Sequence, residues 1–243
     1  MKKRGQTPSI PRGLTAFFTN ATMLPRVLEP EVMDSAEEAR DYDTMDHSAV
    51  NRVFVADFLA VWNGRGPILD VGAGTAQIPI ELCRQAPSAH VVAIDMAEHM
   101  LAVGRENVRR AGLADRLRLE RCDAKQLTYA ANSFGAIISN SIVHHIPEPA
   151  RVLTEMVRVA APGAVLFVRD LLRPPDEATV QRLVTTYAGD ANSHQQQMFA
   201  DSLRAALTLT EVRGLISALG FDAATVRQTT DRHWTWVGHK FAG

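Results

Sequence analysis

Short apolar segments that favour β-strands alternate along this chain with amphipathic segments that favour α-helices. The predicted strands cover residues 68–71, 90–94, 117–119, 135–139 and 165–168. The predicted helices between them cover residues 77–85, 97–111 and 148–160, the last of them stopped by Pro162 and Gly163. Because strands separated by helices form right-handed βαβ units, the sequence predicts an α/β domain built on a doubly wound, mostly parallel sheet.

The two ends of the chain add elements to this alternating core. Residues 1–60 are expected to form an N-terminal helical extension or lid, and residues 61–243 the main domain. Within the extension, one face of an amphipathic helix is predicted from the spacing of Val50, Phe54, Phe58 and Val61. Two further strand-like segments, 225–228 and 234–237, lie close to the end of the chain.

The charge balance and the cysteine content exclude several classes of protein. Lysine and arginine total 26 against 27 aspartate and glutamate, and the net charge of −1 argues against nucleic acid or an anionic membrane as the main partner. Two cysteines that form no Cys-x-x-Cys pair exclude a disulfide framework and a cysteine-rich metal site. With no secretion signal and no apolar run long enough to span a bilayer, we expect a cytoplasmic protein.

A glycine-containing turn follows the first predicted strand, at the edge where parallel sheets bind their ligands. The turn reads Asp70-Val71-Gly72-Ala73-Gly74, and Asp95 follows the second strand. Glycines let the backbone approach an anionic group, and Asp95 is placed to accept hydrogen bonds from ribose hydroxyls. A nicotinamide dinucleotide site has similar features, although Gln77 stands where that fingerprint requires a glycine. The glycine turn by itself therefore does not decide between a nicotinamide dinucleotide and another cofactor that carries a ribose.

The later strand ends distinguish between these cofactors. They read Cys122-Asp123-Ala124 after the third strand, Ser139-Asn140-Ser141-Ile142-Val143-His144-His145-Ile146-Pro147 after the fourth, and Arg169-Asp170-Leu171-Leu172 after the fifth. In order and spacing this series resembles the class I S-adenosylmethionine-dependent methyltransferases. The resemblance covers residues 42–240, and Tyr42-Asp43-x-Met45 resembles the helix start of the small-molecule methyltransferases of quinone biosynthesis. It implies a Rossmann-like sheet of about seven strands that ends in an antiparallel hairpin.

The resemblance also implies which residues bind the methionyl part of S-adenosyl-L-methionine. Gly72 and Gly74 would contact this part, and Asp70 would order their loop and bind the amino group. Asn140 would lie beside the methionyl group and the sulfonium, and Tyr42 would close over the cofactor from the extension.

The nucleoside part of the cofactor is assigned in the same way. Asp95 would bind both ribose hydroxyls, and Met96 would pack on the adenine. Asp123 would accept a hydrogen bond from the adenine amine, and the Ala124 N–H would meet a ring nitrogen. The chain departs from the family at Ala76, where a third glycine is usual.

Candidate catalytic groups follow the fourth and fifth strands. His144 or His145 could act as a general base, and Asp170 could orient a substrate or pair with Arg169 or Arg173. Adjacent histidines on a turn are not expected to point the same way, and without a Glu-x-x-His spacing no metal site is predicted. The polar segment 187–203 is predicted either to cover the acceptor or to be a solvated helix start. Asp43, Met45 and His47 would line the pocket if the extension folds over it.

These features predict S-adenosyl-L-methionine-dependent methyl transfer to a small organic acceptor by in-line displacement. No Asn-Pro-Pro-Tyr-type tetrad follows the fourth strand, which argues against amide and exocyclic base nitrogens as acceptors. Two alternatives stay open at this point: the same fold and cofactor used by a decarboxylase, cyclase or lyase, and a non-catalytic partner subunit. The identity of the acceptor atom and the oligomeric state are not specified by the sequence.

Overall fold

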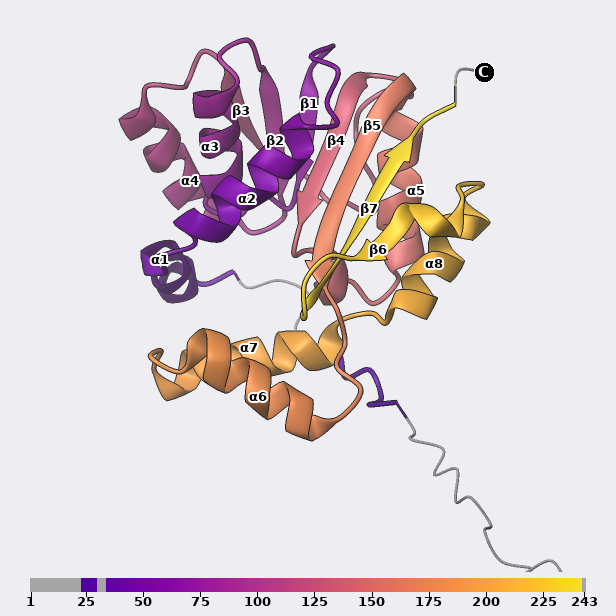
Figure 1. The fold of residues 1–243 in the computed structure, drawn as a ribbon. Coiled ribbons are helices and arrows are strands. Elements are labelled where there is room, and N and C mark those ends of the chain that lie inside the picture. The colour runs from indigo at the N-terminus through magenta and orange to yellow at the C-terminus, as the bar shows by residue number, and fades with distance from the viewer. Residues whose placement is uncertain (1–22, 30–33, 242–243) are drawn as a thin grey trace, which may run out of the picture.

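The computed structural model describes residues 23–29 and 34–241, and within these ranges it contains a single seven-stranded sheet (Figure 1). The strand order is β3-β2-β1-β4-β5-β7-β6; β1 to β5 are parallel, and β7 runs antiparallel to both of its neighbours. The strands are β1 (Ile68–Val71), β2 (Val91–Asp95), β3 (Leu117–Arg121), β4 (Phe134–Asn140), β5 (Ala160–Leu171), β6 (Val226–Gln228) and β7 (His233–His239). The predicted fold, with its antiparallel C-terminal hairpin, is confirmed.

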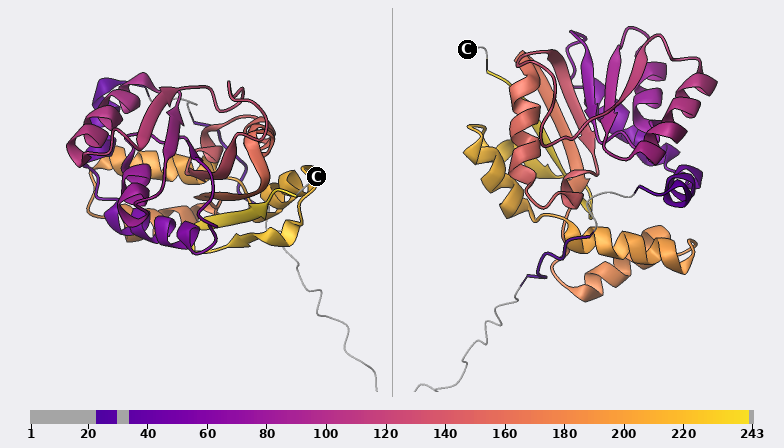
Figure 2. Two further views of the ribbon diagram at one scale, coloured as in Figure 1. Left: turned by 90° about the horizontal axis from the view of Figure 1, so that it is seen from above. Right: turned by 180° about the vertical axis from the view of Figure 1, so that it is seen from behind.

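Helices cover both faces of this sheet because alternate strand residues point to opposite sides (Figure 2). Ile68 packs with α2, α3 and α4 on one face, whereas its neighbour Leu69 packs with α5 and α8 on the other. The helices are α1 (Ala36–Thr44), α2 (Ser48–Leu59), α3 (Gln77–Gln85), α4 (Glu98–Ala111), α5 (Pro149–Val159), α6 (Glu177–Ala188), α7 (Ser193–Ala205) and α8 (Leu209–Ala218), with short 3-10 helices η1 (Val143–His145) and η2 (Ala223–Thr225).

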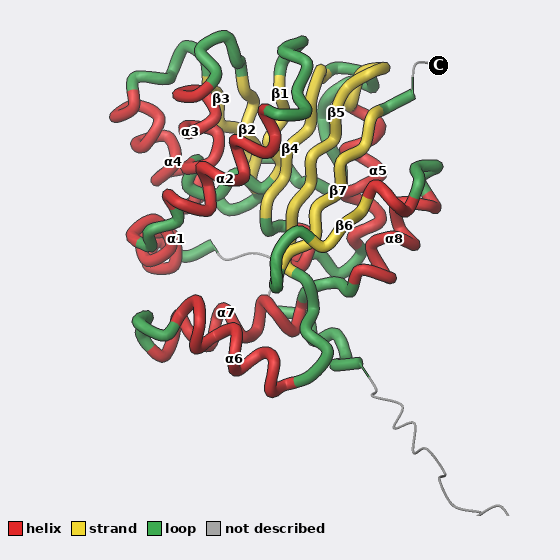
Figure 3. The backbone as a smooth tube through the Cα atoms, viewed as in Figure 1, coloured by secondary structure: helices red, strands yellow, loops and turns green. Residues whose placement is uncertain are grey.

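A third layer lies beyond the carboxyl ends of the parallel strands (Figures 1 and 3). Helices α6 and α7 pack on each other through an apolar cluster that includes Leu171, Leu183 and Leu203. The segment 23–29 is attached to this layer by backbone hydrogen bonds from Leu24 to Pro175 and from Val27 to Arg204. This layer and α1 therefore flank the edge of the sheet where ligands bind.

Most element boundaries agree with the sequence predictions, and of three differences two have a clear physical cause. Strand β5 begins at Ala160, before Pro162 and Gly163, because Ala160 pairs with Phe134 at the start of β4. Pro162 is tolerated because the pairing of β5 with β7 begins only at Val165. Val50 is 47% exposed, because the apolar face of α2 begins one turn later with the buried Phe54. Helix α6 was not among the predicted elements.

The N-terminal extension is divided between two positions in the fold. Helix α2 contributes Phe54, Val55 and Phe58 to the core, whereas α1 lies at the carboxyl edge of the sheet. Residues 1–22 and 30–33 of the predicted lid lie outside the described residues. Among the described helices, none combines the length and the apolar character needed to cross a bilayer.

Candidate active site

The loop between β1 and α3 brings backbone, rather than side chains, to the carboxyl edge of the sheet. Gly72 has φ +83°, and a Cβ atom placed there would lie 2.7 Å from the Ile142 side chain. The N–H groups of Gly72 and Ala73 both donate to the carbonyl oxygen of Ile94, which ties the loop to β2. Ala76, at the position of the family's third glycine, has φ +65°, a left-handed conformation that costs about 1 kcal/mol or more for alanine.

Two carboxylates lie at this loop in different environments. Asp95 is held by backbone donors, because its Oδ2 accepts from Gly74 N at 2.8 Å and its Oδ1 from Ala97 N at 2.9 Å. Asp70 is 2% exposed, and its Oδ2 accepts no hydrogen bond from any described residue. Burial, together with the negative charge of Asp95, raises the pKa of Asp70 to about 8. Burial also raises the pKa of Asp95.

A cavity opens beside this loop, at the edge of the sheet where parallel sheets bind their ligands. Of the nine predicted cofactor residues, eight line it: Tyr42, Gly72, Gly74, Asp95, Met96, Asp123, Ala124 and Asn140. The ninth, Asp70, is not in the cavity wall and lies buried at the end of β1. Sequence reasoning did not name several lining residues that neighbour the motifs, such as Ala97, Met100, Lys125 and Ile146.

Tyr42 shows how α1 contributes to this cavity. Its ring lies over the glycine loop, 3.8 Å from the position of a Cβ atom on Gly74. At the other end of the cavity, Asp123 Oδ1 accepts from Lys125 N at 2.9 Å, which sets the direction of the Asp123 carboxylate. Because the strand order is β3-β2-β1-β4, the lining residues follow one another along the edge from Asp123 and Ala124, past Asp95, to Asn140 and the His145 turn.

His144 and His145 form a 3-10 turn directly after β4, and the two rings lie side by side with centroids 4.1 Å apart. Both rings approach the same carboxylate oxygen, Oε1 of Glu29: His144 through Nε2 at 3.5 Å and His145 through Nδ1 at 3.1 Å. The expectation that adjacent histidines point in different directions is wrong here, because each ring uses a different nitrogen. Of the two, only His145 lines the cavity.

Asp170 is the buried partner of His144. Its Oδ1 lies 2.5 Å from His144 Nδ1, and its Oδ2 accepts from the backbone N of Val143 at 2.6 Å. The alternative ion pairs are not formed, since Arg169 binds Asp57 and Arg173 binds Glu211. Burial acts against ionisation of both partners, but their mutual attraction outweighs it, so the pKa of Asp170 is lowered and the pKa of His144 is raised.

Glu29 was not identified by sequence reasoning. It reaches the histidines because the guanidinium of Arg26 binds the turn: Nη2 donates to the carbonyl oxygens of His144 and Ile146, and Nε to that of Ala205. Burial raises the pKa of Glu29, partly offset by His144 and by a hydrogen bond from Ser202. No local sequence pattern indicates Glu29, since it is positioned through Arg26, and the His144 carbonyl that Arg26 binds lies 118 residues further along the chain.

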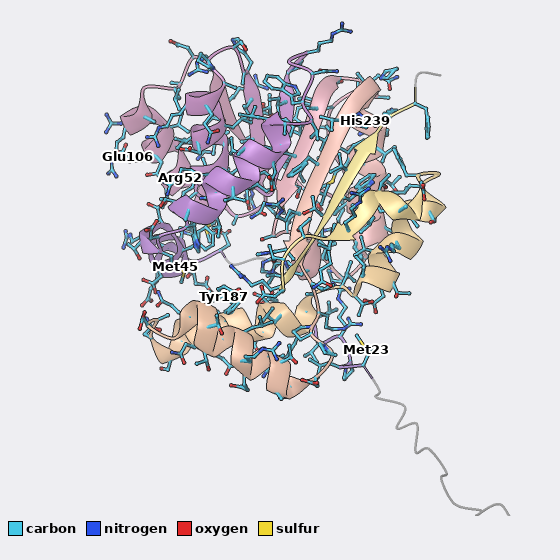
Figure 4. The ribbon with its side chains drawn as sticks, viewed as in Figure 1. Met23, Met45, Arg52, Glu106, Tyr187 and His239 are labelled. Atoms are coloured by element: carbon cyan, nitrogen blue, oxygen red, sulfur yellow. The ribbon has the colours of Figure 1, made fainter. Side chains whose placement is uncertain are left out.

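Two other predicted contributions lie elsewhere. Asp43, Met45 and His47 do not line the cofactor cavity; they line a separate polar hollow against α3 and α4, with Met45 and Arg52 labelled in Figure 4. In the segment 187–203, Asn192 and Gln195 form the capping box of α7, and further amides bind their own helix and the preceding turn. The interpretation of this segment as a solvated helix start thus accounts for these amides.

The sheet order and the cavity at the carboxyl edge define a Rossmann-like α/β protein, and comparison with known proteins identifies its family. Residues 63–223 match the family described as "Methyltransferase domain". A ubiquinone/menaquinone biosynthesis C-methyltransferase of Roseobacter denitrificans is 28% identical over 182 residues, 70% of this chain and 72% of that protein. A SAM-dependent methyltransferase structure from Aquifex aeolicus has a TM-score of 0.60 at 18% identity, over 85% of this chain and 99% of that one. The cyclase SpnF has a TM-score of 0.58 at 17% identity, over 90% of this chain and 99% of its own.

The chain therefore belongs to the class I S-adenosyl-L-methionine-dependent methyltransferases. The residues of the cavity fit that cofactor. The buried Oδ2 of Asp70 has no hydrogen-bond partner among the described residues and offers an acceptor to an ammonium group. At Gly74 the loop leaves space, since the nearest atom to a Cβ position there is on the Tyr42 ring, 3.8 Å away. The side chain of Gln77, where a nicotinamide fingerprint has glycine, bonds instead to Asp43 and Asn51.

Proposed function

We propose that this enzyme transfers a methyl group from S-adenosyl-L-methionine to a small organic acceptor by in-line displacement. One observation carries the proposal: the cavity is continuous from the predicted adenine site at Asp123 and Ala124 to His145 at its far end. When bound, the cofactor supplies a methyl group activated by the sulfonium charge. The protein then has to align the acceptor and exclude water, which a partly enclosed cavity does well.

The assignments of individual cofactor residues are part of this proposal. Asp70 binds the ammonium group, with Gly72 and Gly74 against the methionyl chain. Asp95 binds the ribose hydroxyls. The fixed directions of the Asp95 and Asp123 carboxylates support their roles, because a carboxylate already oriented by backbone N–H groups loses little entropy on binding.

The remaining assignments concern the two ends of the cavity. Met96 packs on the adenine next to Asp123 and Ala124, and Asn140 lies beside the sulfonium. Tyr42 closes the cavity from α1, which supports a lid role for the extension over residues 1–60.

The acceptor is proposed to bind at the histidine end of the cavity. The predicted catalytic roles of His144, His145 and Asp170 stay predictions, supported by the position of His145 in the cavity wall and of Asp170 behind His144. The similarity to a quinone-biosynthesis C-methyltransferase makes hydroxylated ring compounds the first acceptors to screen. A net charge of −1 supports a small acceptor over a nucleic acid.

One alternative has a specific observation in its favour. The cyclase SpnF has the same fold over 90% of this chain, so the fold also supports chemistry other than methyl transfer. The product distinguishes the two, because methyl transfer releases S-adenosylhomocysteine in a one-to-one ratio with the methylated acceptor and a cyclisation does not.

The first experiment is calorimetric titration of the purified protein with S-adenosylmethionine, S-adenosylhomocysteine and NAD. Binding of the first two, and its loss in Asp95→Ala, is the expected result. An acceptor screen that follows S-adenosylhomocysteine then tests turnover. Tight binding of NAD, or no binding of either S-adenosyl compound, would refute the proposal.

A further inference from the structure

We propose that Glu29, His144 and His145 bind one divalent transition-metal ion at the acceptor end of the cavity. This inference rests on the proposed function for the role of the ion, but the site itself is argued from the three side chains. Among the described residues, these are the one group of histidine, cysteine and acidic side chains whose ligand atoms all lie within 4.8 Å of one another.

The distances between the ligand atoms suit a shared ion. Oε1 of Glu29 lies 3.1 Å from His145 Nδ1 and 3.5 Å from His144 Nε2. In tetrahedral or octahedral sites with metal–ligand bonds near 2.1 Å, neighbouring ligand atoms are about 3.0 to 3.4 Å apart. Moreover, this buried oxygen accepts no well-formed hydrogen bond from a described residue, so the approach of the two nitrogens is close but not directed as a hydrogen bond.

Asp170 gives His144 the orientation that a metal ligand needs. A histidine that binds a metal through one ring nitrogen commonly donates its other N–H to a carboxylate, which fixes the tautomer and the ring. Here Nδ1 of His144 lies 2.5 Å from Asp170 Oδ1, while Nε2 faces Glu29. Asp170 is itself held by the backbone N–H groups of Val143 and Leu171.

The location leaves coordination positions for a substrate. His144 is buried, whereas His145 borders the cavity together with Asn140 and Ser141. An ion at this point would have protein ligands on the buried side and open positions toward the acceptor, which is the arrangement of a catalytic rather than a structural site.

The ligand set also restricts the metal and the substrate. Two imidazoles and one carboxylate suit zinc, iron, cobalt or manganese better than magnesium or calcium, which prefer oxygen ligands alone. The ion would hold an oxygen atom of the acceptor and lower the pKa of its hydroxyl group, whose proton passes to solvent. The acceptor class is therefore a phenol, an enol or another hydroxyl compound that reacts as its anion.

The test is metal binding by the full-length protein after treatment with EDTA and desalting. Calorimetric titration with Zn²⁺ is expected to show one ion per chain, and titration with Co²⁺ a visible absorption spectrum of nitrogen and oxygen ligands. Glu29→Gln and His145→Ala are expected to abolish this binding. Asp170→Asn is expected to weaken it about 10- to 100-fold, because it acts through His144.

His99→Ala is the matched control, since His99 also contacts a carboxylate, Asp34 at 3.0 Å, but is half exposed and does not line the cavity. It is expected to bind the ion as the unmodified protein does. Circular dichroism and thermal unfolding show that each variant keeps its fold, independently of whether an S-adenosyl compound binds. No binding to the unmodified protein, or equal binding to Glu29→Gln and His145→Ala, would overturn the proposal and leave His144 as an ordinary partner of Asp170 and Glu29.

The tests of the metal site and of the methyltransferase activity have independent outcomes. If S-adenosylmethionine binds and no metal does, the metal site is refuted and the proposed function stands. If Zn²⁺ binds through Glu29 and His145 but neither S-adenosyl compound binds, the site is supported and the proposed function is refuted.

Discussion

Replacing Asp70 by asparagine removes the carboxyl group that burial perturbs most clearly at the cofactor loop. The pKa of Asp70 is raised from 3.8 to about 8, so between these values the folded chain keeps a proton that the unfolded chain has lost. Because the folded state binds more protons than the unfolded state in this range, Asp70 makes the protein less stable as the pH rises. The slope is about 1.4 kcal/mol per pH unit for one proton.

The expected result is a difference between two pH profiles. From about pH 5.5 to about pH 7.5, the free energy of unfolding of the unmodified protein should fall by about 3 kcal/mol relative to that of Asp70→Asn. Urea unfolding of the ligand-free chain at several pH values measures this difference.

The same substitution tests the role of Asp70 in binding. An ammonium group pairs with the ionised carboxylate, so the affinity of the unmodified protein for S-adenosylmethionine should rise as the pH approaches 8. Asp70→Asn should bind weakly without this rise. Parallel stability profiles for Asp70→Asn and the unmodified protein would refute the reasoning, because the buried carboxyl would then not hold its proton in the folded state.

Three further substitutions test the loop and the N-terminal segment. Gly72→Ala should destabilise the fold by about 1 to 3 kcal/mol more than Gly163→Ala in urea unfolding, because both have positive φ but only the first meets the Ile142 side chain. Ala76→Val should lower the free energy of unfolding by about 2 kcal/mol, since a β-branched side chain is strongly disfavoured at φ +65°; an unchanged midpoint would contradict this strain. Arg26→Lys keeps the charge but cannot make the three carbonyl contacts, so hydrogen exchange at the His144 turn should accelerate, and equal protection would count against the anchoring role.

The cofactor edge could be predicted because it depends on local pattern alone. A strand followed by glycines predicts the β1 turn, and the carboxyl ends of parallel strands necessarily meet at one edge. Eight of the nine residues that the family resemblance assigns to the cofactor line one cavity, all but Tyr42 from the ends of strands. The boundaries of β1 and α3 agree with prediction to the residue.

Side-chain partners at that edge could not be predicted in the same way. Several basic residues near Asp170 in the sequence could have been its ion-pair partner. Only the packing of β5 against the η1 turn places His144 beside Asp170, while Arg169 and Arg173 bind other carboxylates. The burial of the α2 face is another case, because periodicity identifies the face but not where the core begins, and Val50 lies outside it.

The amino-acid sequence by itself determined the sheet and its carboxyl edge, because strand and helix periods and glycine turns are properties of neighbouring residues. The roles of the cofactor residues were implied by the resemblance to a methyltransferase family and stay proposals. The tertiary structure alone decided that Glu29 joins His144 and His145. That contact depends on Arg26 binding three carbonyl groups far along the chain, and no pattern of nearby residues encodes which distant backbone oxygens will lie within its reach.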